Sequence, residues 1–136
     1  GIAIGKRTYR AYCELLASNR WKKLADSGAR IQRLLWASTG TKDPSASDTL
    51  YVEALAAPDT INTMPEKTLH AYAEHGAPAD AMDSDGDGSI TVLATFAQNG
   101  IDIPSLAENL QREGAEAFVK SWQQLIQRIA DKSSAV

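Results

Sequence analysis

The stretch RLLWASTGTKDP, residues 33–44, is the part of the sequence that indicates the fold most clearly. Residues 33–38 form a short apolar run between turn signals, which is typical of a strand buried on both faces of a sheet. The second half predicts a loop, because Gly40 frees the backbone and Pro44 suits the first turn of a helix. The sequence therefore predicts a buried strand followed by a loop and a helix.

The segments that follow repeat the same order. Ser45 and Asp48 have the spacing of a capping box, which predicts a helix reaching residue 57. Residues 60–63 are typical of a second short strand, and another helix is predicted over 65–75. Alternating strands and helices favour a parallel sheet wrapped by helices. Two short parallel strands do not form a stable sheet alone, so we expect further strands upstream.

Helices are predicted on both sides of these strands. The apolar spacing of Tyr9, Tyr12, Cys13 and Leu16 indicates an amphipathic helix from about residue 4. A short second helix, capped by Ser18 or Asn19, is stopped by Gly28. Near the C-terminus we expect a helix over 89–98, a separate turn at Pro104, and a long helix whose apolar side chains recur from 118 to 129.

The composition describes one ordinary domain or a piece of one. The chain has 136 residues and a formal net charge of -3, with nine basic and two acidic side chains in residues 1–42 and five against fifteen in residues 43–136. The single cysteine, Cys13, cannot form an internal disulfide, which favours a cytoplasmic location. No apolar run approaches the roughly 18 residues of a membrane span, so we expect no membrane partner.

One acidic motif suggests an alternative function. Asp83, Asp85 and Asp87 match the first three ligand positions of a calcium loop, with a glycine at its sixth position. The twelfth position, which supplies a bidentate glutamate in such loops, is Ala94 here. A calcium-binding interaction module is therefore the alternative, and an acidic surface linker that forms turns is the favoured interpretation.

The basic first third suggests another alternative, a phosphate-binding or nucleic-acid-binding module. No nucleic-acid motif supports it, so solvated helix faces are favoured and we expect no nucleic-acid partner. His70 and His75 lie five residues apart with no cysteine nearby, and neither has the spacing of a metal ligand. The loop over 36–42, with a glycine, hydroxyls and Lys42, could hold a phosphate at the carboxyl end of a strand.

The residues already quoted resemble a known family. The run 33–44, followed by SDTLYV at 47–52 and DTINTMP at 59–65, closely resembles the transaldolases. Residues 20–21, 28–30 and 113–114, with Phe118, are similar too. The chain is similar to the C-terminal part of the long bacterial form, with the upstream barrel strands absent.

This resemblance implies a fold and a function. Transaldolases are TIM, or (α/β)8, barrels, so the two predicted strands would be the last two, residues 1–76 barrel units, and residues 77–136 a C-terminal helical segment. They transfer a dihydroxyacetone unit between sugar phosphates in the pentose phosphate pathway, without a metal or organic cofactor. A lysine forms a Schiff base with the donor ketone.

The resemblance also implies what this chain contributes. The catalytic lysine and its acidic partners belong to earlier strands, so we expect no catalytic residue among residues 1–136. Lys42 holds about the place of the family's phosphate-binding cation, with Ser38 at the strand's end, and these two are the predicted substrate-binding residues. We expect the chain alone to be inactive, with the missing N-terminal part of the enzyme and sugar phosphates as partners. A homodimer remains an open alternative.

Overall fold

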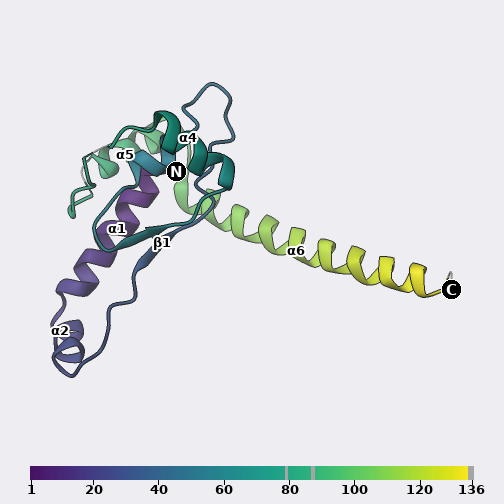
Figure 1. Cartoon of the computed structure of the whole chain (residues 1–136), viewed down its shortest axis with the longest axis horizontal. Coiled ribbons are helices and arrows are strands. Elements are labelled where there is room, and N and C mark those ends of the chain that lie inside the picture. The colour runs from purple at the N-terminus through teal and green to yellow at the C-terminus, as the bar shows by residue number, and fades with distance from the viewer. Residues whose placement is uncertain (79, 87, 135–136) are drawn as a thin grey trace. The chain divides into compact units, whose positions relative to one another are not determined.

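The computed structural model describes residues 1–78, 80–86 and 88–134 (Figure 1). The chain divides into two compact units, Gly1–Val92 and Leu93–Val136. No helix of the described residues is both long and apolar enough to cross a membrane. In chain order the elements are α1 Ile2–Ala17, α2 Asn19–Asp26, β1 Leu34–Trp36, α3 Leu50–Ala54, β2 Thr60–Asn62, α4 Glu66–His75, α5 Ser89–Gln98 and α6 Ile103–Ser134.

The two predicted strands form a parallel pair. Leu34 pairs with Thr60, and the register continues to Trp36 opposite Asn62. A parallel pair requires a crossover connection, and α3 lies in the connection between β1 and β2. The predicted α/β class and the parallel direction of the strands are therefore confirmed.

One face of this strand pair is uncovered. Leu35 and Ile61 are partners in the register, and their side chains keep 49% and 43% of their surface exposed. The prediction of strands buried on both faces is therefore wrong for this chain. The physical reason is that the described residues cover only the face that carries Trp36, which is 9% exposed.

The core of the first unit lies where α1 meets the strands. Tyr9 of α1, Trp36 of β1 and Leu55 after α3 form a buried cluster, against which Tyr12 and Met82 pack among other partly buried side chains. The Tyr9 hydroxyl donates a 3.3 Å hydrogen bond to the carbonyl of Pro58. Burial raises the pKa of the Tyr9 phenol to about 12, because the charged phenolate would be desolvated.

Helix α3 is shorter than the sequence indicates. It begins at Leu50 and ends at Ala54, rather than extending from Ser45 to residue 57. The backbone N–H and hydroxyl of Ser45 instead donate to the carboxylate of Asp43, at 2.9 and 2.7 Å. This local turn competes with the capping box, as side chains of this kind commonly do.

The ends of α2 agree with the sequence. The Ser18 side chain accepts a 3.2 Å hydrogen bond from the N–H of Trp21, so Ser18 is the cap. Gly28 follows the helix with a φ of 91°, a left-handed conformation that glycine adopts without strain.

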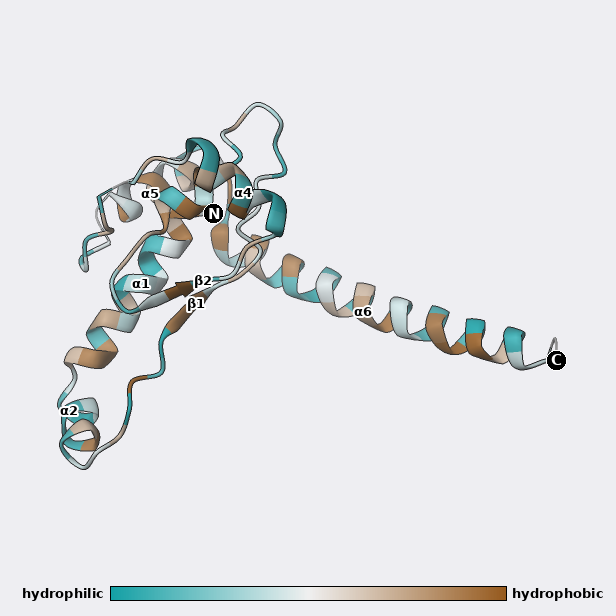
Figure 2. Cartoon of the chain, viewed as in Figure 1, coloured by the Kyte–Doolittle hydropathy of each residue, from teal (hydrophilic) through white to brown (hydrophobic). Residues whose placement is uncertain are grey.

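Helix α6 is one continuous helix of 32 residues. The predicted break near Pro104 is absent, because proline is tolerated in the first turn of a helix, where its missing N–H is not needed. Apolar and polar residues alternate along α6 (Figure 2). Its large apolar side chains from Leu106 onward are exposed, with Phe118 at 82% and Trp122 at 62%.

Candidate functional site

The loop after β1 forms one wall of a pocket. The pocket has a volume of about 400 Å³ and brings together Ser38 and Lys42, the two predicted substrate-binding residues. Both side chains belong to exposed residues. The lining is completed by Gly40, Thr41, Asp43, Ala46, Leu50 and Tyr51. The pocket therefore lies at the carboxyl end of a strand, where ligands bind in open α/β sheets.

Ser38 has an unusual backbone conformation. Its φ is 58°, in the left-handed region that side chains other than glycine rarely adopt. Such a conformation costs on the order of 1 kcal/mol or more and persists only where neighbouring contacts enforce it. Ser38 is the second residue after the end of β1, so the left-handed residue turns the chain into the pocket loop.

The pocket offers several donors for an anion. Lys42 provides an ammonium group, and Ser38 provides a hydroxyl. The Thr41 hydroxyl is buried and has no hydrogen-bond partner among the described residues, a situation that costs about 1–3 kcal/mol. A bound oxyanion would be an acceptor for such groups.

Asp43 is the acidic residue of the pocket. Its carboxylate accepts both hydrogen bonds from Ser45, and these hydrogen bonds lower its pKa. The carboxylate is therefore charged at neutral pH and already engaged. It offsets the charge of Lys42, so the hydroxyls and the geometry of the loop must contribute to any selectivity for an anion.

Sequence reasoning missed the residues that hold this loop. The buried hydroxyl of Thr39 donates to Asn62 Oδ1 at 2.7 Å and lies 3.2 Å from the carbonyl oxygen of Thr63. Thr63 in turn donates from its backbone N–H to the carbonyl of Trp36 at 2.8 Å. The available signal was that Thr39 follows the end of β1 and Asn62 ends the neighbouring parallel strand β2, which places them at one edge of the sheet.

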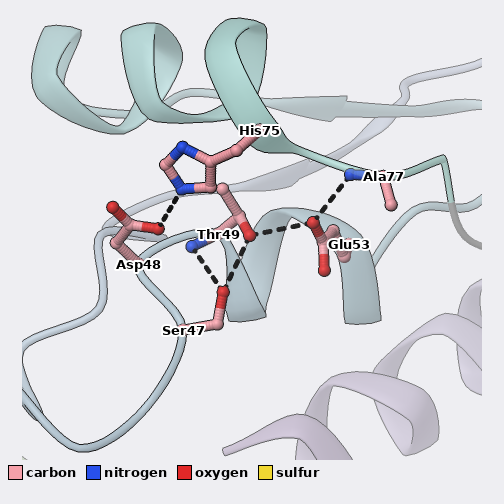
Figure 3. Close-up of polar contacts among 6 residues, drawn as sticks. All are labelled: Ser47, Asp48, Thr49, Glu53, His75 and Ala77. Atoms are coloured by element: carbon pink, nitrogen blue, oxygen red, sulfur yellow. Dashed lines mark hydrogen bonds and ion pairs between the residues drawn. The ribbon is translucent and has the colours of Figure 1, made fainter.

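A second polar cluster links the loop before α3 with the end of α4 (Figure 3). The buried Thr49 hydroxyl donates to Glu53 at 2.8 Å and lies 2.9 Å from the Ser47 hydroxyl, while the Ala77 N–H also donates to Glu53. His75 Nε2 lies 2.9 Å from Asp48 Oδ1. These contacts join the two segments, and we call the cluster of Ser47, Asp48, Thr49, Glu53 and His75 the clamp.

The ionisation of this clamp gives a pH-dependent prediction. The hydrogen bond between His75 and Asp48 raises the pKa of His75 above 6.5 and lowers the pKa of Asp48 below 3.8. The negative charges of Glu74 and Glu53 also favour the imidazolium form of His75. The positive charge of Lys67 also favours the carboxylate form of Asp48. The histidine contribution to stability is complete below pH 6.5 and is lost as the pH rises through the folded-state pKa. The aspartate contribution is present above pH 3.8 and is lost as the pH falls. We therefore expect the ion pair to stabilise the fold most between pH 3.8 and 6.5.

Thermal unfolding of His75→Gln, Asp48→Asn and the double variant, each made in the joined enzyme that is defined under Proposed function, checks this prediction. Each single variant should lower the midpoint in that pH window and converge with the unchanged protein well above it. The double variant should lose no more than either single variant, since both remove the same pair. Additive losses would contradict the assigned pairing.

The calcium-like segment is structural in the described residues. Gly86, with a φ of 72°, lies against α1, and a side chain there would come within 3.1 Å of the Lys6 carbonyl oxygen. The Met82 N–H donates to the carbonyl of Ala56. Asp87 lies outside the described residues. Among those described, no group of three histidine, cysteine, aspartate or glutamate residues is placed to hold a metal ion.

The exposure of each lysine side chain decides whether it could form a Schiff base. Lys6 is half-buried, and the other described lysines belong to exposed residues. A Schiff-base lysine must be neutral near pH 7, which requires a desolvated or cationic niche. The described part of the chain does not place any lysine in a buried niche.

Known proteins match nearly the whole sequence. Residues 1–129 match the family described as transaldolase/fructose-6-phosphate aldolase. A transaldolase from Thermobifida fusca is 44% identical over 135 residues, which cover 98% of this chain and 37% of the relative. A transaldolase from Mycolicibacterium smegmatis is 48% identical over 127 residues, covering 93% of this chain and 34% of the relative.

The transaldolase from Frankia alni is similar to the same extent, with 46% identity over 132 residues. The chain spans about a third of the length of these relatives. Identity at this level across the chain, together with the family match over residues 1–129, settles the classification. The chain therefore belongs to the transaldolase/fructose-6-phosphate aldolase family.

Proposed function

We propose that the complete protein is a transaldolase and that residues 1–136 supply the C-terminal part of its barrel. The family match over residues 1–129 carries this proposal. In this proposal β1 and β2 are the last two strands of an (α/β)8 barrel, residues 1–76 are barrel units, and residues 77–136 are a C-terminal helical segment. The exposed Leu35 and Ile61 support it, since the remaining strands would cover that face.

The reaction we propose is transfer of a dihydroxyacetone unit between sugar phosphates. Sedoheptulose 7-phosphate and glyceraldehyde 3-phosphate would give erythrose 4-phosphate and fructose 6-phosphate. A lysine amine condenses with the donor ketone and releases water. The iminium then accepts the electron pair of the breaking carbon–carbon bond while a carboxylate takes the proton of the adjacent hydroxyl, so that erythrose 4-phosphate leaves as an aldehyde. The resulting enamine attacks the acceptor aldehyde, and water then releases the product from the lysine.

The role proposed for this chain is to bind a substrate phosphate. Ser38 and Lys42 line one pocket, and Thr41 adds an unpaired hydroxyl beside them. Phosphate held at one end of the substrate fixes the reacting carbons relative to a lysine elsewhere in the barrel. We place that lysine outside residues 1–136, because the described lysines are exposed or half-buried.

The proposed setting of the enzyme is the cytoplasm. The protein has a single cysteine, and Cys13 is free and half-buried beside the core. A free thiol in that place fits a reducing compartment. The proposed partners are the sugar phosphates and the remaining two thirds of the enzyme.

A joined enzyme tests the proposal. In it, residues 1–136 replace the matching stretch of the Thermobifida fusca relative, which is 44% identical. We expect the joined enzyme to convert fructose 6-phosphate and erythrose 4-phosphate, and to prefer fructose 6-phosphate to unphosphorylated fructose. A joined enzyme that unfolds cooperatively like the unmodified relative, yet has no activity, would overturn the proposed function.

A further inference from the structure

The loop of the pocket is held from behind by the end of β2. Thr39 is 3% exposed, and its hydroxyl lies between Asn62 Oδ1 at 2.7 Å and the Thr63 carbonyl oxygen at 3.2 Å. A hydroxyl has a single proton, so the shorter bond to Asn62 is the principal one. Asn62 is the last residue of β2 and pairs with Trp36 of β1, so its backbone position is fixed by the sheet. The hydrogen bond from Thr39 therefore ties the loop to the sheet.

The residues on either side of Thr39 depend on this anchor. Ser38 has the left-handed φ of 58° and lines the pocket. An unusual conformation of this kind persists only where surrounding contacts enforce it. The hydroxyl of Thr39, one residue further, supplies such a contact.

Gly40 completes the attachment. A Cβ atom on Gly40 would lie 3.1 Å from Pro65 Cγ and 3.4 Å from Thr68 Oγ1, so the loop backbone packs directly against the start of α4. The loop is therefore fixed by a hydrogen bond at Thr39 and by close packing at Gly40. Lys42 follows two residues after this contact.

We infer that Thr39 is a positioning residue of the phosphate pocket, where its buried hydroxyl, anchored on Asn62, fixes the orientation of Ser38 and Lys42. The inference rests on the proposed function, since it assigns Thr39 a role in that same pocket. Thr39 acts through its neighbours and does not itself line the pocket. Loss of the hydroxyl therefore affects binding of the phosphate end of the substrate more than the chemical step.

The test uses Thr39→Val and Thr39→Ser in the joined enzyme. Valine keeps the shape of the side chain and removes the hydroxyl, whereas serine keeps the hydroxyl. We expect Thr39→Val to raise the KM for fructose 6-phosphate about fivefold or more and to change kcat less than twofold. The kcat/KM for unphosphorylated fructose should not change. Thr39→Ser should have a KM close to that of the unchanged joined enzyme, because serine keeps the hydroxyl. If the threonine acted only through its shape, Thr39→Ser would raise the KM more than Thr39→Val.

Thr60→Val is the matched control. The Thr60 hydroxyl donates a 2.7 Å hydrogen bond to the carbonyl of Ala57 at the opposite end of β2. This variant removes a hydrogen-bonded threonine hydroxyl from β2 itself, and should leave the KM for fructose 6-phosphate unchanged. Equal increases in KM for Thr39→Val and Thr60→Val would overturn the inference, because general loosening of the sheet would then explain both.

Lys42→Met separates this inference from the proposed function. If Lys42→Met raises the KM for fructose 6-phosphate and Thr39→Val does not, the pocket stands and the positioning role of Thr39 is overturned. If Lys42→Met and Thr39→Val both leave the preference for the phosphorylated sugar intact, the phosphate site lies elsewhere. The phosphate-binding role of this pocket and the positioning role of Thr39 are then both overturned, whereas the transaldolase activity of the joined enzyme is not.

Discussion

Residues 1–136 alone are expected to form no borohydride-stable adduct with fructose 6-phosphate, whereas the joined enzyme is expected to form one. An amine in water is protonated near pH 7, and only the neutral amine condenses with a ketone. The described lysines are exposed or half-buried, so none has the desolvated niche that this chemistry requires. The joined enzyme should therefore be trapped as an adduct, and residues 1–136 alone should remain unmodified.

Intact mass spectrometry after borohydride reduction measures this result. The joined enzyme is the positive control, and peptide mapping should place its adduct upstream of the segment supplied by this chain. An adduct on residues 1–136 themselves would show that the Schiff-base lysine lies in this chain. Lys42 would then be the first residue to substitute, because it is the lysine that lines the pocket.

The order of elements could be predicted because its signals are local. The apolar run before Ser38 and the left-handed exit at Gly28 each act within a few residues. The start of α4 beside Pro65 is of the same kind. Hydrophobic runs, turn residues and helix stops need only the neighbouring sequence to take effect.

Two errors arose where several local signals compete. Ser45 could cap a helix or bond to Asp43, and the structure takes the second option. Pro104 could break a helix or begin one, and it lies in the first turn of α6. In both cases the sequence permits two local arrangements. The Asp43 carboxylate offers Ser45 an alternative to capping a helix, and proline fits the first turn of a helix as well as it ends one.

The rest of the candidate site depends on contacts between distant residues. Thr39 and Asn62 are 23 residues apart, and they meet only because β1 and β2 pair in one particular register. Asp48 and His75 are 27 residues apart and meet where the loop before α3 approaches the end of α4. Ser38 and Lys42 could be predicted as a pair because they lie within one loop, but the residues that hold this loop could not.

The exposure of Leu35 and Ile61 follows from a different cause. Apolar runs in parallel strands normally face covering elements on both sides, and the sequence correctly signals that need. The chain spans about a third of its relatives, so the residues that we propose cover this face lie outside it. Exposed apolar faces and open strand edges favour association, and we expect residues 1–136 alone to associate or to lack a cooperative unfolding transition.

Lys42→Met in the joined enzyme is expected to lower kcat/KM for fructose 6-phosphate about 10- to 100-fold, mainly through KM. A hydrogen bond to a charged group contributes about 1.5–3 kcal/mol, which corresponds to this range. Methionine keeps the length of the side chain and removes the charge, so the change isolates the electrostatic contact. Activity toward unphosphorylated fructose should stay the same, because that substrate offers no phosphate to bind.

Lys23→Met, which removes an exposed lysine from α2, is the matched control and should leave kcat/KM for both sugars unchanged. An equal loss toward both sugars would show that Lys42 supports the fold or the chemical step, and not the phosphate end of the substrate.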